Sequence, residues 1–127
     1  MSMSDPRPTD ILHRVTEEFG ASSGRAIELL ENVPSPLTER VRILRCIVFL
    51  AEGDIRLLPL LIEHAFVDYR DIIFWAEYRD WLSERPQRIR NFGRPFGKHA
   101  LVVLGPTGDS HRLPSDVLRS FRRKLRR

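Results

Sequence analysis

Residues 68–81 read DYRDIIFWAEYRDW, and this stretch carries a complete helix signal with a polar group at each end. Asp68 is a favourable N-cap, and Asp71 stands three residues later, where an acidic side chain can reach back to the amide of the cap. Residues 72–76 are apolar in succession, so nearly every side of the helix needs cover. The stretch therefore predicts a buried helix that starts at Asp68.

One tetrapeptide occurs almost twice in this stretch, as DYRD at residues 68–71 and as EYRD at residues 77–80. Nine residues at about 100° each amount to roughly two and a half turns, so the copies project from opposite sides of a helix. They cannot form one symmetric site. We interpret the first copy as a helix cap and the second as the polar end of the helix, with Arg79 near the negative end of its dipole.

The segment before this stretch predicts the central helices of the fold. Ser35 is an N-cap, and Pro36 occupies the first helical position, where its missing N–H costs nothing. A broad apolar stripe follows, and Gly53 suits the left-handed position that ends a helix. Beyond Arg45 this helix is apolar all round, which places its second half in the core. We expect its arginines to face away from the centre of the stripe: Arg40, Arg42 and Arg45.

Three further helices are expected on the N-terminal side of Asp68. Residues 55–66 form an apolar helix in which Pro59 forces either a kink or a start near Leu57. A first helix begins after a cap at residues 9–10 and ends at Gly20. A second helix begins at residues 22–23 and stops before Pro34, because a proline disfavours the helical conformation of the residue before it.

The composition changes after residue 81. Residues 82–99, LSERPQRIRNFGRPFGKH, predict a long loop, and residues 100–104, ALVVL, predict a strand. A turn at residues 105–108 would return the chain along residues 109–113 as a short hairpin. Ser115 then caps a final helix. Its apolar residues fall on one side and its basic residues on the other, so one face can pack on the body while the other faces water.

The predicted fold is α+β and mostly α. About five helices form a compact body, a small β-hairpin lies near residues 100–113, and an amphipathic basic helix closes the chain. Its 127 residues are typical of one domain. We expect a flexible tail at residues 1–9 and a single globular domain at residues 10–127, with an acidic helical part at 10–81 and a basic part at 82–127.

The composition also bears on location. The longest apolar run is residues 46–51, CIVFLA, whereas a membrane-spanning helix needs about 20 apolar residues. The first residues contain no apolar signal region, and a single cysteine, Cys46, cannot form an internal disulfide. We therefore expect a cytoplasmic protein without a membrane partner.

The distribution of charge is the strongest indication of function. Residues 1–81 carry 9 Arg and 14 Asp or Glu, whereas residues 82–127 carry 10 Arg, 2 Lys and 3 Asp or Glu. The formal net charge of +4 is therefore the sum of −5 and +9. Such an asymmetry favours an anionic partner for the C-terminal third. The same charge can also serve solubility, or neutralise the acidic helices of the chain itself.

Motifs for catalysis or cofactors are weak. VVLGPTGDS at residues 102–110 lacks the lysine and the glycine spacing of a phosphate-binding loop. Residues 109–111, Asp-Ser-His, are adjacent, and a catalytic triad needs partners from separate elements. We expect no metal and no cofactor. An enzyme with a site that is not continuous in sequence remains an alternative, around Glu63, His64, Asp68 and Asp71.

The sequence predicts a non-enzymatic binding module whose basic third contacts the backbone of a nucleic acid. Arginines would neutralise phosphates, and two phenylalanines among them would stack on exposed bases. The expected contact residues are Arg85, Arg88, Arg90, Phe92, Arg94, Phe96, Lys98, Arg119, Arg122, Arg123 and Arg126. An acidic protein surface is the alternative partner, as for an inhibitor or immunity-type module. Exposed strand edges at residues 100–104 also leave a homodimer open.

Overall fold

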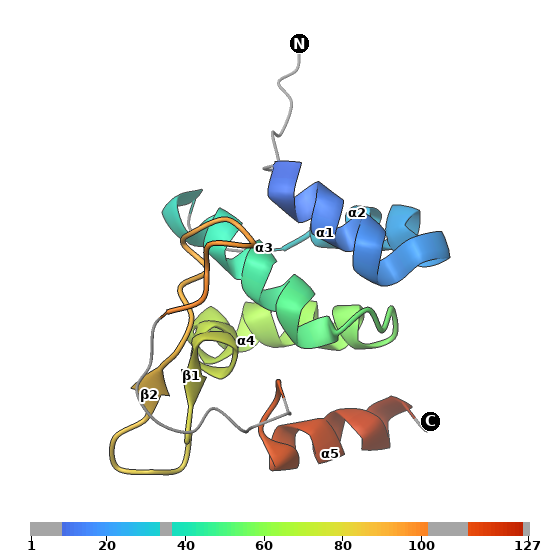
Figure 1. Cartoon of the computed structure of the whole chain (residues 1–127). Helices are drawn as coiled ribbons and strands as arrows, with labels where there is room; N and C mark the ends of the chain where they lie inside the picture. Colours follow the sequence, from blue (N-terminus) through green and yellow to red (C-terminus); the bar gives the residue numbers. More distant parts are fainter. Residues whose placement is uncertain (1–8, 34–36, 102–111, 126–127) are drawn as a thin grey trace.

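The computed structural model describes residues 9–33, 37–101 and 112–125. Three predicted features lie outside the described residues: residues 1–8 of the predicted tail, the expected helix start at residues 35–36, and most of the predicted hairpin. Thr9, the last residue of the predicted tail, is the first residue of a helix. The elements run α1 (Thr9–Phe19), η1 (Gly20–Ser22), α2 (Ser23–Leu30), α3 (Leu37–Ala51), α4 (Leu57–Glu77), β1 (Tyr78–Arg79), β2 (Gln87–Arg88) and α5 (Ser115–Leu125). This is an α+β fold, mostly α. Figure 1 shows α3 at the centre, α1 and α2 above it, and α5 below α4.

The core centres on α3. Every residue from 43 to 51 is buried, which confirms that the second half of this helix is covered on all sides. Ile11, Val15 and Phe19 of α1 belong to the same hydrophobic core. Burying one such aliphatic or aromatic side chain contributes about 1.5–3 kcal/mol. No helix among the described residues is long and apolar enough to cross a membrane.

The turn between α3 and α4 follows the sequence signals. Gly53 has φ of +76°, and a Cβ at this position would lie 2.5 Å from the backbone oxygen of Glu18 in α1. Glycine is therefore needed both for its conformation and for the close approach of the two backbones. Helix α4 begins at Leu57, so Pro59 lies in the first turn, where no intrahelical N–H bond is lost. Of the two expected alternatives, a kink at Pro59 and a start near Leu57, the structure has the second.

Two helices were expected on either side of Asp68, one at residues 55–66 and one starting at Asp68, and in the structure both are part of α4. The body therefore contains four α-helices, α1–α4, within the described residues rather than five. The backbone of Asp68 is nevertheless non-helical, with φ of −160° and ψ of 99°, and its Oδ1 accepts the N–H of Arg70 at 3.0 Å. Asp68 thus caps the second half locally. Asp71 contacts His64 Nε2 at 2.9 Å instead of the cap amide. This contact spans the break and joins the two halves of α4.

The described strands are short and lie outside the predicted hairpin. β1 and β2 pair antiparallel, with Tyr78 opposite Arg88 and Arg79 opposite Gln87. An isolated bridge joins Arg90 to Ala100, the first residue of the predicted strand. Because α4 ends at Glu77, Arg79 is part of β1, and its guanidinium donates to Gln87 Oε1 rather than to the end of the helix.

Glu77 explains why the chain returns to the end of α4. Its side chain is 0% exposed, and both oxygens accept hydrogen bonds. Arg42 of α3 donates to both carboxylate oxygens, through Nε at 2.9 Å and Nη2 at 2.5 Å. Arg88 Nε donates to Oε1 at 3.0 Å, and the Phe92 amide donates to Oε2 at 2.8 Å. One buried carboxylate therefore joins α3, α4 and the segment after β2.

A second carboxylate ties α1 to the same segment. Arg45 donates to both oxygens of Asp10, at 2.9 and 3.1 Å, and to the carbonyl of Phe92 at 3.0 Å. The amide of Phe96 donates to Asp10 Oδ2 at 2.9 Å. Burial alone would raise the pKa of Asp10, but the bonds from Arg45 and Phe96 outweigh it, so this pKa is lowered.

The expectation that the α3 arginines face outward is wrong for two of them. Arg45 is buried, and Arg42 points at Glu77. Both are compatible with an apolar surrounding because a carboxylate pairs with each guanidinium in bidentate geometry.

Candidate nucleic-acid interface

The exposed cations of the basic part do not form one continuous surface. Arg94 and Lys98 lie in the orange segment at the upper left of Figure 1, beside α3, whereas α5 lies at the bottom. Arg85 lies in the connection between β1 and β2. Arg126 is outside the described residues. The predicted contact residues therefore separate into a dispersed loop group and a compact group on α5.

Two predicted contact residues hold the fold together. Arg88 bonds Glu77 and also donates to Asn91 Oδ1 at 3.1 Å. Arg90 donates to the carbonyl of Ala76 at 3.3 Å, and its guanidinium lies 4.5 Å from the centre of the Phe49 ring. Both side chains are half-buried. Reaching a phosphate would require them to leave these contacts, so their first role is to fix the segment after β2.

The predicted stacking phenylalanines pack internally. Phe92 is 0% exposed, and its ring lies 5.1 Å from Phe49 and 4.9 Å from His99 between centroids. Phe96 is half-buried, with the guanidinium of Arg14 4.8 Å from its ring centre. In this arrangement Phe92 presents no face to a base. The alternation of arginine and phenylalanine in the sequence reflects how this loop packs on α1 and α3.

His99 completes this packed cluster. Its Nδ1 accepts the amide of Gly97 at 3.2 Å, and its ring stacks on Phe92 with 16° between the planes. Burial lowers the pKa of His99, and the nearby charges of Arg14, Arg90 and Arg112 lower it further. The folded protein therefore favours the neutral imidazole of His99 more strongly than the unfolded chain does.

We expect the pKa of His99 to make the fold less stable as the pH falls from 7 to 5. In the unfolded chain the pKa of His99 is about 6.5, so below this pH the unfolded chain binds a proton more readily than the folded chain does. The free energy of unfolding therefore decreases as the pH falls. Urea unfolding at each pH measures this. His99→Gln should flatten the dependence in this window, whatever it does to stability at pH 7. Equal slopes for both proteins would show that another group is responsible.

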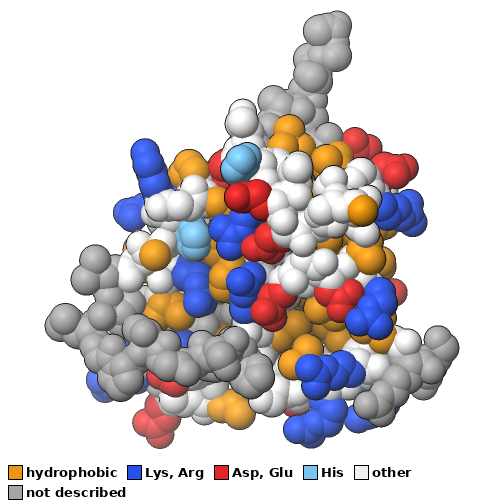
Figure 2. All heavy atoms as spheres, turned by 45° about the vertical axis from the view of Figure 1, so that its right-hand side comes forward, with side chains coloured by type: hydrophobic (Ala, Val, Ile, Leu, Met, Phe, Trp, Pro, Cys, Tyr) orange, Lys and Arg blue, Asp and Glu red, His pale blue; other side chains and the backbone are white. Residues whose placement is uncertain are grey.

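Helix α5 presents the compact group of cations. Phe121 is buried, and Leu118 is half-buried against the core. The opposite side carries exposed arginines, and none has an acidic partner within ion-pair distance among the described residues: Arg119, Arg122 and Arg123. Lys124 alone on this helix has such a partner, Glu63 of α4 at 3.7 Å. Figure 2 shows Lys and Arg side chains gathered at the lower right of the molecule, over α5.

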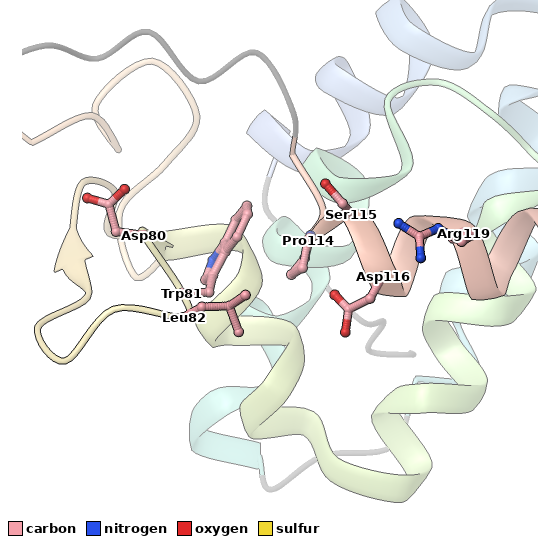
Figure 3. Close-up of a pocket in the computed structure, with 7 residues that line it drawn as sticks. All are labelled: Asp80, Trp81, Leu82, Pro114, Ser115, Asp116 and Arg119. Atoms are coloured by element: carbon pink, nitrogen blue, oxygen red, sulfur yellow. The ribbon is translucent and has the colours of Figure 1, made fainter.

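A cleft borders this basic face. It lies between residues 80–82 and the start of α5 at residues 114–119, and it has a volume of about 520 Å³. Figure 3 shows Trp81 and Leu82 on one side and Pro114 and Asp116 on the other. Leu82 is 98% exposed. This cleft leaves no signal in the sequence, because its two sides are more than thirty residues apart and neither carries a motif.

The alternative enzyme site is only partly assembled. His64 contacts Asp71, and its ring centre lies 4.7 Å from that of Trp75. Asp68 pairs with Arg70 at 3.1 Å, and Glu63 pairs with Lys124. Asp68 and Asp71 line one pocket and His64 contacts Asp71, whereas Glu63 is directed toward α5. Three of the four expected residues therefore lie near one another, and Glu63 does not join them. Within the described parts of the chain, no three His, Cys, Asp or Glu side chains are grouped so that they could hold a metal ion.

The fold and this surface define a class rather than a family: a small, mostly helical protein with a basic helix on its outside. No protein-family model, curated protein or solved structure matches this chain. A function is therefore inferred from the residues of this chain alone.

Proposed function

We propose that the chain is a non-enzymatic binding module that holds the backbone of a nucleic acid on the outer face of α5. The observation that carries this proposal is the set of three exposed arginines on one helix, each without an acidic partner among the described residues. Residues three and four apart are neighbours on a helix surface, so Arg119 lies beside both Arg122 and Arg123. A guanidinium pairs with phosphate oxygens in bidentate geometry, which makes arginine well suited to this partner.

The packing of α5 supports the same interpretation. Phe121 holds the helix on the body, and Val117, Leu118 and Leu125 pack against the same core. The arginines are thereby presented to solvent in one direction. Arginines carried on a folded helix lose less backbone conformational entropy on binding than arginines on a disordered tail.

The test is fluorescence anisotropy with labelled single- and double-stranded oligonucleotides across a series of salt concentrations. One variant carries Arg119→Gln, Arg122→Gln and Arg123→Gln. The control carries Arg85→Gln, Arg94→Gln and Lys98→Gln, which removes the same charge from the dispersed loop group. Each phosphate contact to a single strand contributes about 0.7 to the salt slope, so the α5 variant should lower the slope by about 2.

The control variant should keep most of the affinity and most of the salt slope. If the two variants lose affinity equally, net charge rather than the α5 face governs binding. If the protein binds no oligonucleotide even at low salt, the proposed function is wrong.

A protein partner is the second candidate, and one observation favours it. Phe66 and Val67 are 67% and 76% exposed, next to the break at Asp68. Adjacent apolar side chains in solvent are typical of interaction sites when they form part of a larger patch. This candidate requires one protein partner and no general affinity for polyanions. The same anisotropy series therefore distinguishes the two candidates.

A further inference from the structure

We infer that the nucleic acid held by α5 is single-stranded, and that one of its bases enters the cleft between residues 80–82 and 114–119. This inference rests on the proposed function and specifies its ligand. It follows from three properties of the cleft: its apolar surfaces, its position beside the arginines, and the sign of the charge on its walls.

The apolar surfaces suit a flat aromatic ring. Trp81 and Leu82 form one side of the cleft and Pro114 part of the other (Figure 3). The indole Nε1 of Trp81 donates to the carbonyl of Phe74 at 3.3 Å, so its polar edge is satisfied and its ring is held in place. The volume of about 520 Å³ lies within the usual range for small-ligand sites. Every base has a π-face that can stack on such a surface.

The position of the cleft links it to the basic face. Arg119 lines the cleft and is also the first of the three exposed arginines on α5. When the phosphates of a strand lie along these arginines, the neighbouring base of that strand therefore lies at the entrance of the cleft. Binding would cover Leu82, which is 98% exposed in the free protein and is the most exposed of the large apolar residues described. Removing this side chain from water favours the bound state.

The charge on the walls determines which part of the strand enters. Asp80 and Asp116 line the cleft together with a single cation, Arg119, which is also part of the basic face. The two carboxylates repel phosphate from the cleft, and Arg119 attracts it toward α5. The backbone is therefore directed to the arginines and the base to the cleft. A carboxylate accepts a hydrogen bond from an exocyclic amino group, such as N4 of cytosine. Thymine and uracil have no such group, so the cleft favours amino-bearing bases.

A duplex cannot use this cleft at the same affinity. Its bases are stacked and paired, and extruding one costs a few kcal/mol. Arginines on α5 can still contact the backbone of a duplex, because phosphate contacts carry no sequence or strand information. The inference therefore predicts a difference in affinity between single and double strands, in addition to the binding that both share.

The experiment compares three labelled oligonucleotides of equal length at one salt concentration: oligo(dC), oligo(dT) and a duplex. The wild-type protein should bind oligo(dC) roughly five- to a hundred-fold more tightly than the duplex, the range expected for stacking of one base. Oligo(dT) should lie between them. Leu82→Ser should remove most of the preference for single strands and leave duplex binding unchanged. Since Leu82 is almost fully exposed, this variant is expected to fold normally.

Phe66→Ser is the matched control, because it removes another exposed apolar side chain from a different surface. It should leave all three affinities unchanged. If the wild type binds single and double strands equally, or if Leu82→Ser and Phe66→Ser behave alike, the inference is overturned and the proposed function stands. If no oligonucleotide binds at low salt, both fail together.

Discussion

Replacing Glu77 with alanine is expected to lower the free energy of unfolding by about 3–5 kcal/mol, the usual loss when one partner of a buried ion pair is removed. The carboxylate is 0% exposed and holds Arg42, Arg88 and the amide of Phe92. Without it, Arg88 loses its acidic partner, Arg42 keeps only Glu39 at 3.7 Å, and the buried N–H of Phe92 loses its acceptor. Urea unfolding followed by tryptophan fluorescence measures the loss.

Glu63→Ala is the control for this prediction. Glu63 lies on the same helix, but its side chain is 69% exposed and its ion pair with Lys124 spans 3.7 Å. Exposed pairs of this kind contribute little, so the change should stay within about 0.5 kcal/mol. Glu77→Gln should fall between the two, because an amide keeps the shape and part of the hydrogen bonding without the charge. Equal losses for Glu63→Ala and Glu77→Ala would mean that the buried carboxylate contributes no more than a surface one.

Local signals in the sequence located the helix boundaries well. Gly53 was predicted in the left-handed conformation and is found there. Pro59 predicted either a kink or a helix start near Leu57, and the helix starts at Leu57. Asp68 carries the backbone geometry of a cap even though α4 continues past it. Each of these features is determined by neighbours within a few residues, so a short window of sequence contains the physical cause.

The buried ion pairs were missed because their causes are distant in sequence. Arg42 finds Glu77 and Arg45 finds Asp10, each across 35 residues. A helical wheel assigns both arginines to the outside, since it contains no information on a carboxylate from another element. The same limit hid the two-stranded pairing at residues 78–88. The chain returns there because residues 88–92 bond to the end of α4.

The candidate interface was predicted in part for the same reason. The charge of α5 is visible in its sequence, and its arginines are exposed as expected. The contacts of Arg88 with Glu77 and of Arg90 with Ala76 could not be predicted, because they form only in the folded chain. The cleft was invisible, because Trp81 and Pro114 become neighbours only through the packing of two distant segments. Composition thus indicated the positive charge of this surface but not how its residues are arranged.

Replacing Phe92 with alanine is expected to cost about 3–5 kcal/mol, as for other fully buried aromatic side chains. The ring is 0% exposed and packs on Phe49, Phe96 and His99. The backbone of Phe92 is held at both its polar groups, by Glu77 and by Arg45. The segment therefore cannot easily move inward to fill the cavity, which places the expected loss in the upper part of this range. Urea unfolding measures it, with Phe66→Ala at an exposed position as the control, expected within about 0.5 kcal/mol.

Phe92→Leu separates the structural role of this residue from a role in binding. Leucine keeps most of the apolar volume and removes the aromatic face, so the loss of stability should be much smaller than for alanine. If Phe92 serves only the core, Phe92→Leu should bind oligo(dC) with the affinity of the wild type, while Leu82→Ser does not. Loss of binding in a folded Phe92→Leu protein would instead place the aromatic ring in the interface. It would also require the loop at residues 91–99 to open, since the ring has no exposed face in the closed arrangement.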